Sequence, residues 1–191
     1  MVVIIDCGST KVPQIVDFVS EFTECVCVKI SNFQAQEFPI LDGFIISGAP
    51  ILITEMDLNE HSMKIAEILN SGVPVLGICF GHQMIGLHFG AKAFKMAEDR
   101  EINTIDVLFH NKLFLGLEKK FEMTEDHCEH ISLPEDFVHI ASSNKCWNEG
   151  MKHASKEIYG IQFHPESSGI LGKKIIENFI AICTKASQKI A

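Results

Sequence analysis

A cysteine between two glycines is the residue of this sequence best placed for covalent chemistry. Cys79 lies in Gly77-Ile-Cys-Phe-Gly81, where an apolar run over residues 73–78 gives way to a helical pattern. The spacing matches the G-x-S-x-G nucleophile elbow with cysteine in place of serine, a sharp turn whose close backbone approach glycine tolerates. A helix N-terminus at this point favours the thiolate, the form that attacks carbonyl groups. The pentapeptide alone fits equally well with an inert, buried cysteine beside two packing glycines.

A histidine and a glutamate two residues apart could supply the base that such a cysteine needs. His164 and Glu166 lie in Gly160-Ile-Gln-Phe-His-Pro-Glu166, at the end of another predicted strand. Imidazole, with an ordinary pKa of about 6.5, can take the thiol proton and return it to a leaving amine. Glu166 could accept the other ring N–H and fix the tautomer, as the acid of a catalytic triad does. An isolated His-Pro-Glu is usually only a turn, but two such strand ends could meet at the carboxyl edge of an α/β sheet.

An acyl-transfer site also needs two N–H donors for the developing oxyanion. The elbow geometry provides one from Phe80, the residue directly after the cysteine. The best-placed source of the second is Ser47-Gly48-Ala49-Pro50, which follows an apolar run over residues 43–47. The alternative for this tetrapeptide is an ordinary Gly-Pro turn.

Two further polar segments do not carry recognised chemistry. Asp126-His-Cys-Glu-His130 mixes metal-ligand residue types, but no partner pair at ligand spacing stands elsewhere in the sequence. We therefore expect a polar surface loop or a substrate-facing loop there, with no metal and no cofactor. Asp6-Cys-Gly-Ser-Thr10 lacks both G-x-G-x-x-G and G-x-x-x-x-G-K-[ST], which disfavours dinucleotide and P-loop chemistry.

Alternating apolar runs and helical patterns predict the elements that would position these residues. The first half of the chain predicts strands at residues 2–5, 25–30, 43–47 and 73–78 and helices at residues 12–22 and 59–70, with another after Cys79. That order is typical of a doubly wound α/β sheet. The second half predicts strands at residues 102–109, 120–124, 137–142 and 158–163 with little helix between them, then a last helix over residues 169–184. These strands predict an antiparallel extension of a parallel core.

Composition indicates how many domains the chain forms, which partners are unfavourable and in which compartment it works. The chain has 191 residues, 47% of them hydrophobic, which is enough for one packed core and predicts one domain over residues 1–191. Its net charge of −9 and the lack of any Lys/Arg run argue against nucleic-acid and membrane-surface partners. No apolar run has the length of a membrane span, and none reads as a secretory signal. The seven cysteines lack any C-x-x-C spacing, so we expect a reducing cytoplasm.

Together these segments resemble the class I glutamine amidotransferases, whose triad domain hydrolyses glutamine to glutamate and ammonia. The resemblance rests on four segments: D-C-G-S at 6–9, S-G-A-P at 47–50, G-I-C-F-G-H-Q at 77–83 and G-I-Q-F-H-P-E at 160–166. Within the family, Met151-Lys-His153, His127-Cys-Glu129 and Asn178-Phe179 are most similar to the glutaminase part of GMP synthetase. The fold implied is a flavodoxin-like, doubly wound, mostly parallel sheet with an antiparallel extension.

The resemblance also implies roles for individual residues. The catalytic residues would be Cys79 as the nucleophile that forms a γ-glutamyl thioester, His164 as base and then acid, and Glu166 as its orienting group. Ala49 and Phe80 would provide the oxyanion N–H groups, and the glutamine substrate would lie near Gly48, Gln83 and His127.

Several residues depart from the family pattern. Ala49 stands where glycine is usual, and Phe80 where leucine or tyrosine is usual. Thr10-Lys11 and Glu129 depart from the GMP synthetase pattern. If the backbone at Ala49 needed a positive φ, its Cβ would add strain of about 1 kcal/mol, and Ala49→Gly would then raise the basal glutaminase rate.

The resemblance implies a partner as well. Because the chain ends at Ala191 after one helix, we expect its ammonia to be used by a separate ATP pyrophosphatase chain, with GMP synthesis from xanthosine monophosphate (XMP) as the leading expectation. Two alternatives stay open. One is an independent γ-glutamyl hydrolase with the same triad and no partner, and the other is a catalytically weak regulatory or binding paralogue, supported only by Ala49.

Overall fold

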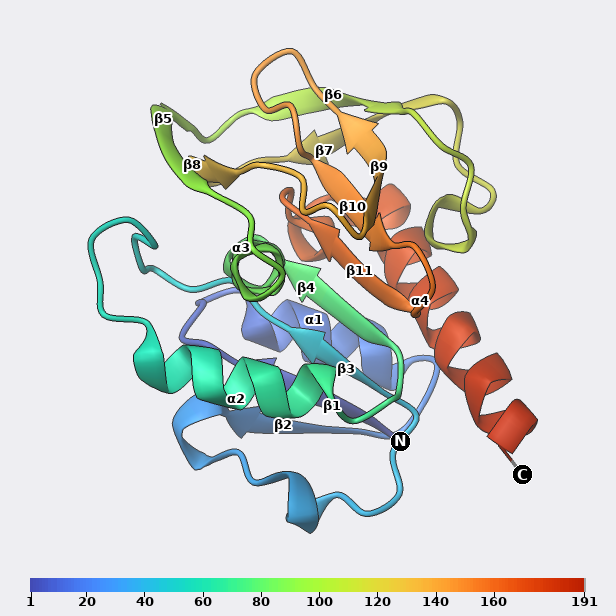
Figure 1. The fold of residues 1–191 in the computed structure, drawn as a ribbon. Helices are drawn as coiled ribbons and strands as arrows, with labels where there is room; N and C mark the ends of the chain where they lie inside the picture. Colours follow the sequence, from blue (N-terminus) through green and yellow to red (C-terminus); the bar gives the residue numbers. More distant parts are fainter. Residues whose placement is uncertain (191) are drawn as a thin grey trace.

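Five parallel strands form one half of a nine-stranded sheet (Figure 1). The computed structural model describes residues 1–190 and the side chains of residues 1–187. In their order across the sheet, the parallel strands are β2 (Cys25–Lys29), β1 (Val2–Asp6), β3 (Gly43–Ile46), β4 (Val75–Ile78) and β11 (Ile158–Ile161). β3 and β4 are buried along their whole length, as expected of parallel strands covered on both faces.

Two helix layers cover this parallel half. On one face lie α1 (Val12–Ser20) and α4 (Gly169–Ile190), and on the other α2 (Asn59–Leu69) and α3 (Phe80–His88) (Figure 1). The two-residue period of a strand explains the division. Val2 and Ile4 belong to the apolar core beneath α1 and α4, whereas Val3 and Ile5 belong to the core beneath α2 and α3.

Antiparallel strands complete the sheet beyond β11. They are, outward from β11, β10 (Gly150–His153), β9 (Phe137–Ser142), β6 (Ile102–Val107) and β7 (Lys120–Thr124). A separate two-stranded ribbon joins β5 (Ala93–Asp99) to β8 (His127–Ile131). The predicted doubly wound sheet with an antiparallel extension is confirmed. None of the helices in the described part of the chain combines the length and apolar composition that crossing a bilayer requires.

The structure corrects the sequence-based assignment of strands in two ways. The strand predicted at residues 158–163 is β11, which pairs in parallel with β4 and so belongs to the core rather than to the extension. β5, β8 and β10 were not predicted. β8 buries alternate residues, but these include His127 and Glu129, so its sequence lacks the alternation of apolar and polar residues on which strand prediction depends.

The pairing of β4 with β11 positions the candidate site. Ile78 and Ile161, the last residues of the two strands, are direct neighbours in the register. The segments that follow them therefore leave the same edge of the sheet side by side. This is the carboxyl edge, where open α/β sheets place their ligands.

Candidate active site

Cys79 has the backbone conformation of a nucleophile elbow. Its φ of 50° and ψ of −105° make it the only non-glycine residue with positive φ in the described part of the chain. The flanking glycines allow the turn, because a Cβ on Gly77 would lie 2.5 Å from the Gly81 carbonyl carbon and one on Gly81 would lie 2.4 Å from the Ile46 oxygen. A backbone held this way costs about 1–3 kcal/mol, which the surrounding structure must offset. The turn places the sulfur at the N-terminus of α3.

His164 and Glu166 form a buried pair beside this elbow. His164 Nδ1 lies 2.7 Å from Glu166 Oε1, and both side chains are almost fully buried. Pro165 begins the short 3-10 helix Pro165–Ser167, which presents the carboxylate to the ring two residues back. Because a carboxylate can only accept a hydrogen bond, Nδ1 is the protonated nitrogen of the ring. The other nitrogen, Nε2, makes no hydrogen bond to the described residues. The ring is oriented as a general base must be.

The electrostatics of His164 favour an imidazolium. Burial by itself lowers its pKa, but the neighbouring Cys79 sulfur and the Glu166 carboxylate outweigh that effect and raise the pKa of His164 to about 10. A histidine in this state can stabilise a thiolate and later donate a proton to a leaving group.

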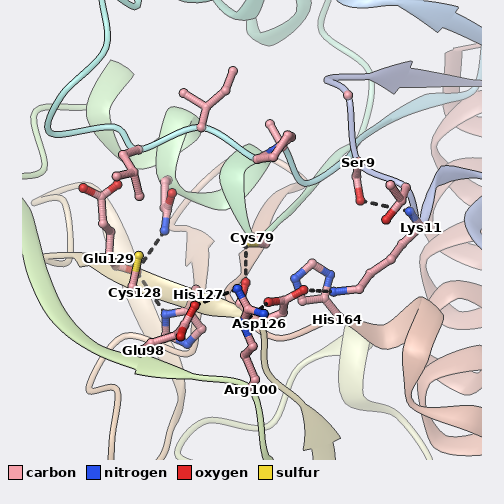
Figure 2. Close-up of a pocket in the computed structure, with 17 residues that line it drawn as sticks. Ser9, Lys11, Cys79, Glu98, Arg100, Asp126, His127, Cys128, Glu129 and His164 are labelled. Carbon is pink, nitrogen blue, oxygen red and sulfur yellow. Dashed lines mark hydrogen bonds and ion pairs between the residues drawn. The ribbon is translucent and has the colours of Figure 1, made fainter.

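A cavity of about 280 Å³ opens onto the cysteine (Figure 2). Of the eight residues given a catalytic, oxyanion or substrate-binding role from the sequence, five line it: Ala49, Cys79, Gln83, His127 and His164. Glu166 lies behind His164, and the Phe80 ring is buried in the core. Gly48 backs onto the histidine, since a Cβ there would lie 3.3 Å from His164 Cε1. Sequence analysis therefore predicted residues that the fold brings together.

The two candidate oxyanion donors are free. The N–H groups of Ala49 and Phe80 make no hydrogen bond to other described residues. Ala49 does not have the positive φ that the sequence analysis considered, because its backbone lies outside the left-handed region. The Cβ of Ala49 therefore does not cause the backbone strain that a positive φ would bring.

This correction reverses the expectation for Ala49→Gly. Glycine would relieve no strain and would add backbone freedom to the loop. We expect the basal glutaminase kcat of Ala49→Gly to be unchanged or lower by up to a few-fold, measured as glutamate release by the isolated chain. A reproducible rise in kcat would contradict the structure of this loop.

Gln83 and His127 make internal hydrogen bonds at the floor of the cavity. Gln83 Nε2 donates to the Glu129 main-chain oxygen (3.0 Å) and to Gln162 Oε1 (3.1 Å), which leaves only the Gln83 oxygen for a ligand. His127 Nδ1 lies 3.0 Å from the same Glu129 oxygen, and its Nε2 lies 3.2 Å from Glu125 Oε2. Both ring nitrogens of His127 are therefore directed at protein groups rather than at the cavity.

The segment from Asp126 to His130 is not the loop that its polar sequence predicts. Its residues 127–130 belong to β8, while Asp126, His127, Cys128 and Glu129 line the cavity. The Glu129 carboxylate accepts hydrogen bonds from the Ile53 amide (2.5 Å) and the Thr54 hydroxyl (2.5 Å). It thereby fixes the segment after Ser47-Gly48-Ala49-Pro50 beside the cavity.

The ion pairs at the rim of the cavity were not predicted. Asp126 accepts from Lys11 Nζ at 2.6 Å and lies 3.5 Å from Arg100 Nε, and Arg100 also pairs with Glu98 (Figure 2). Burial raises the pKa of Asp126, but its bond to Lys11 and the surrounding positive charges outweigh this and lower it. Lys11 was noted only as a departure from a family pattern, and its pairing with Asp126 depends on tertiary contacts that the sequence does not reveal.

The comparison with known families agrees with this geometry. The sequence model of glutamine amidotransferase class-I matches residues 3–183. The chain belongs to the class I glutamine amidotransferases. Membership makes it a glutamine amidotransferase enzyme, and the triad-like geometry lies within the matched residues.

Relatives and solved structures extend the comparison. The glutamine-hydrolysing GMP synthase subunit of Methanosphaera stadtmanae is 44% identical over 145 residues, 74% of each chain. The corresponding protein of Thermoplasma acidophilum is 37% identical over 157 residues, 80% of this chain and 78% of that one. The crystal structure of a candidate GMP synthase subunit from the same organism superposes with a TM-score of 0.90 at 30% identity, covering 98% of this chain and 95% of the other. Among class I amidotransferases, this chain is therefore similar to the glutamine-hydrolysing subunit of GMP synthase.

Proposed function

We propose that Cys79, His164 and Glu166 form the triad with which this amidotransferase hydrolyses L-glutamine to glutamate and ammonia. The observation that carries the proposal is the pairing of His164 Nδ1 with Glu166 at 2.7 Å beside a cysteine in the elbow conformation. In that arrangement Glu166 fixes the tautomer, His164 Nε2 is left for proton transfer, and the sulfur opens onto the cavity.

The chemistry would proceed in two halves. His164 takes the thiol proton, and the Cys79 thiolate attacks the side-chain amide carbon of glutamine to give a tetrahedral oxyanion. The free N–H groups of Ala49 and Phe80 are the donors proposed for that oxyanion. His164 then protonates the departing nitrogen, which leaves as ammonia with the γ-glutamyl thioester on sulfur. Water, deprotonated by the same histidine, hydrolyses the thioester to glutamate and restores the thiol.

We further propose that the ammonia passes to a separate ATP pyrophosphatase chain for synthesis of GMP from XMP. The support is the similarity to proteins named as one subunit of GMP synthase, a designation that implies a second subunit in those organisms. The surface expected to dock is the carboxyl edge around the cavity, where ammonia could leave without meeting bulk water. A net charge of −9 favours a partner with a basic docking surface, which would speed association at low salt more than it deepens affinity.

A titration tests this partner. The isolated chain is mixed with increasing amounts of an ATP pyrophosphatase chain in the presence of ATP and XMP, and glutamate release is followed. We expect stimulation of several-fold or more, with no release from a Cys79→Ala control at any partner concentration.

The two alternatives predict other outcomes of the same titration. A high basal rate that the partner leaves unchanged would favour an independent γ-glutamyl hydrolase. Failure to release glutamate with or without the partner would favour a regulatory or binding paralogue.

A further inference from the structure

Three ionisable side chains gather in a buried cluster behind the cavity. Glu125 and His127 flank Asp126 at the start of β8, and Glu149 directly precedes β10. Glu125, His127 and Glu149 are all buried, with total exposures of 1%, 8% and 0%. One potential ligand atom from each lies within 4.8 Å of those of the other two. The ring of His127 is visible beside the cavity in Figure 2.

The hydrogen bonds of the cluster are made by atoms that point away from its centre. His127 Nδ1 lies 3.0 Å from the Glu129 main-chain oxygen, and since a carbonyl only accepts, Nδ1 carries the ring proton and Nε2 presents a lone pair. Glu149 Oε1 accepts from Ser143 Oγ at 2.6 Å. Among the described residues, Glu149 Oε2, both oxygens of Glu125 and His127 Nε2 make no hydrogen bond, although His127 Nε2 lies 3.2 Å from Glu125 Oε2.

Such an arrangement is unfavourable when it is empty and the carboxyls are charged. Two buried carboxylates repel each other, and a nitrogen lone pair directed at them adds to the repulsion. The ammonium of Lys145, which also acts on Glu125, is paired with Asp99 at 3.2 Å and Glu101 at 2.6 Å. No Lys or Arg side chain in the described part of the chain forms an ion pair with Glu125 or Glu149, although the His164 side chain lies near Glu125.

We propose that Glu125, His127 and Glu149 bind one divalent transition-metal ion, with Zn²⁺ the best fit. One imidazole nitrogen and two carboxylates suit Zn²⁺ better than Mg²⁺ or Ca²⁺, which prefer oxygen ligands alone. The two charges of the metal would balance the two carboxylates. The bond from His127 Nδ1 to a carbonyl and the bond from Ser143 to Glu149 are outer contacts of the kind that orient metal ligands.

The proposed site bears on the glutaminase cavity without depending on the proposed triad. Asp126 lies between two of the ligands, and its main-chain oxygen is 4.0 Å from Cys79 Sγ. The Glu129 oxygen that holds His127 also accepts from Gln83. A bound metal would therefore fix the segment that forms the cavity floor. Spacing within Asp126–His130 did not reveal the site, because two ligands lie outside that motif and one of them, Glu149, is brought in by the fold.

Direct metal binding tests the proposal. The full chain is treated with a chelator, and Zn²⁺ binding is measured by competition with a chromogenic chelator, with Co²⁺ as a spectroscopic probe. We expect one equivalent of tight binding, a Co²⁺ spectrum without a sulfur charge-transfer band, and a rise in the thermal unfolding midpoint on Zn²⁺ addition. Glu149→Gln, the neutral isostere, should weaken Zn²⁺ binding by at least about 10-fold. The matched control is Glu122→Gln on the exposed face of β7, which should bind as the wild type does.

Several results would overturn the site. They are the absence of stoichiometric binding by the wild-type chain, a sulfur charge-transfer band that points to cysteine ligands, and unchanged affinity in both Glu149→Gln and Glu125→Gln. Circular dichroism checks that each variant is folded. If Glu149→Gln is not, Glu149→Asp replaces it, because the shorter side chain keeps the charge but loses reach, and it should weaken Zn²⁺ binding as well.

Discussion

Replacing Cys79 by alanine should abolish glutamine hydrolysis while leaving the fold in place. Loss of the nucleophile removes the thioester route altogether, so we expect kcat to fall by at least about 10⁴-fold. Cys79 is 7% exposed and its sulfur accepts a hydrogen bond from Gln162 at 3.5 Å. Its removal should therefore cost stability of only about 1 kcal/mol. Glutamate release and the thermal unfolding midpoint measure the two effects separately.

The control for this prediction is another cysteine of the same cavity. Cys128 also lines it, but burial and the nearby Glu129 and Glu98 raise the pKa of the Cys128 thiol, which disfavours its reactive form. A diazo-ketone mimic of glutamine should label Cys79 and none of the other six cysteines. Cys128→Ser should keep the label and Cys79→Ala should lose it, as read by peptide mass spectrometry. Labelling at Cys128, or turnover near the wild-type rate in Cys79→Ala, would contradict the assignment of the nucleophile.

The parallel half of the fold could be predicted because burial on both faces leaves a clear sequence pattern. Strands such as β4 are continuous apolar runs bounded by turn residues. The ribbon of β5 and β8 left no such pattern. β5 is largely exposed, and β8 turns His127 and Glu129 inward. There the His127 ring pairs with the Glu129 main-chain oxygen of the same strand, and the Glu129 carboxylate accepts from the Ile53 amide of another segment. Strands whose inward side chains are polar do not show the hydrophobic alternation from which strands are predicted.

The candidate site could be predicted in part for a similar reason. Cys79 and His164 each follow a recognisable strand, and residues at the carboxyl ends of parallel strands share one edge of the sheet. The sequence does not show that β4 and β11 are adjacent in register, which is what brings the two residues together. The contacts of Asp126 with Lys11 and of Glu125 with Glu149 join segments far apart in the chain. Pairings of that kind have no local signature.

Replacing His164 by alanine should cost more activity than replacing Glu166 by glutamine. His164→Ala removes both the group that activates the thiol and the acid that protonates ammonia, so we expect kcat/KM to fall by about 10² to 10⁴-fold or more. In the wild-type structure His164 Nδ1 lies 2.7 Å from the Glu166 carboxylate, and Glu166→Gln keeps an oxygen that can still accept this hydrogen bond. The glutamine variant should therefore keep part of the orientation that the carboxylate provides. Both values come from glutamate release at saturating and limiting glutamine.

The pH profile separates the orienting role from a merely structural one. Glu166 is one of the two groups that raise the pKa of His164 to about 10, so its neutral replacement should lower that pKa. The imidazolium would then be lost at lower pH as the solution becomes alkaline, and the alkaline limb of the Glu166→Gln profile should move toward neutrality relative to the wild type. A variant that only loosened the fold would lower the unfolding midpoint and leave the limb in place. Greater damage from Glu166→Gln than from His164→Ala would show that the carboxylate does more than orient the base, and the roles assigned to the pair would have to be exchanged or abandoned.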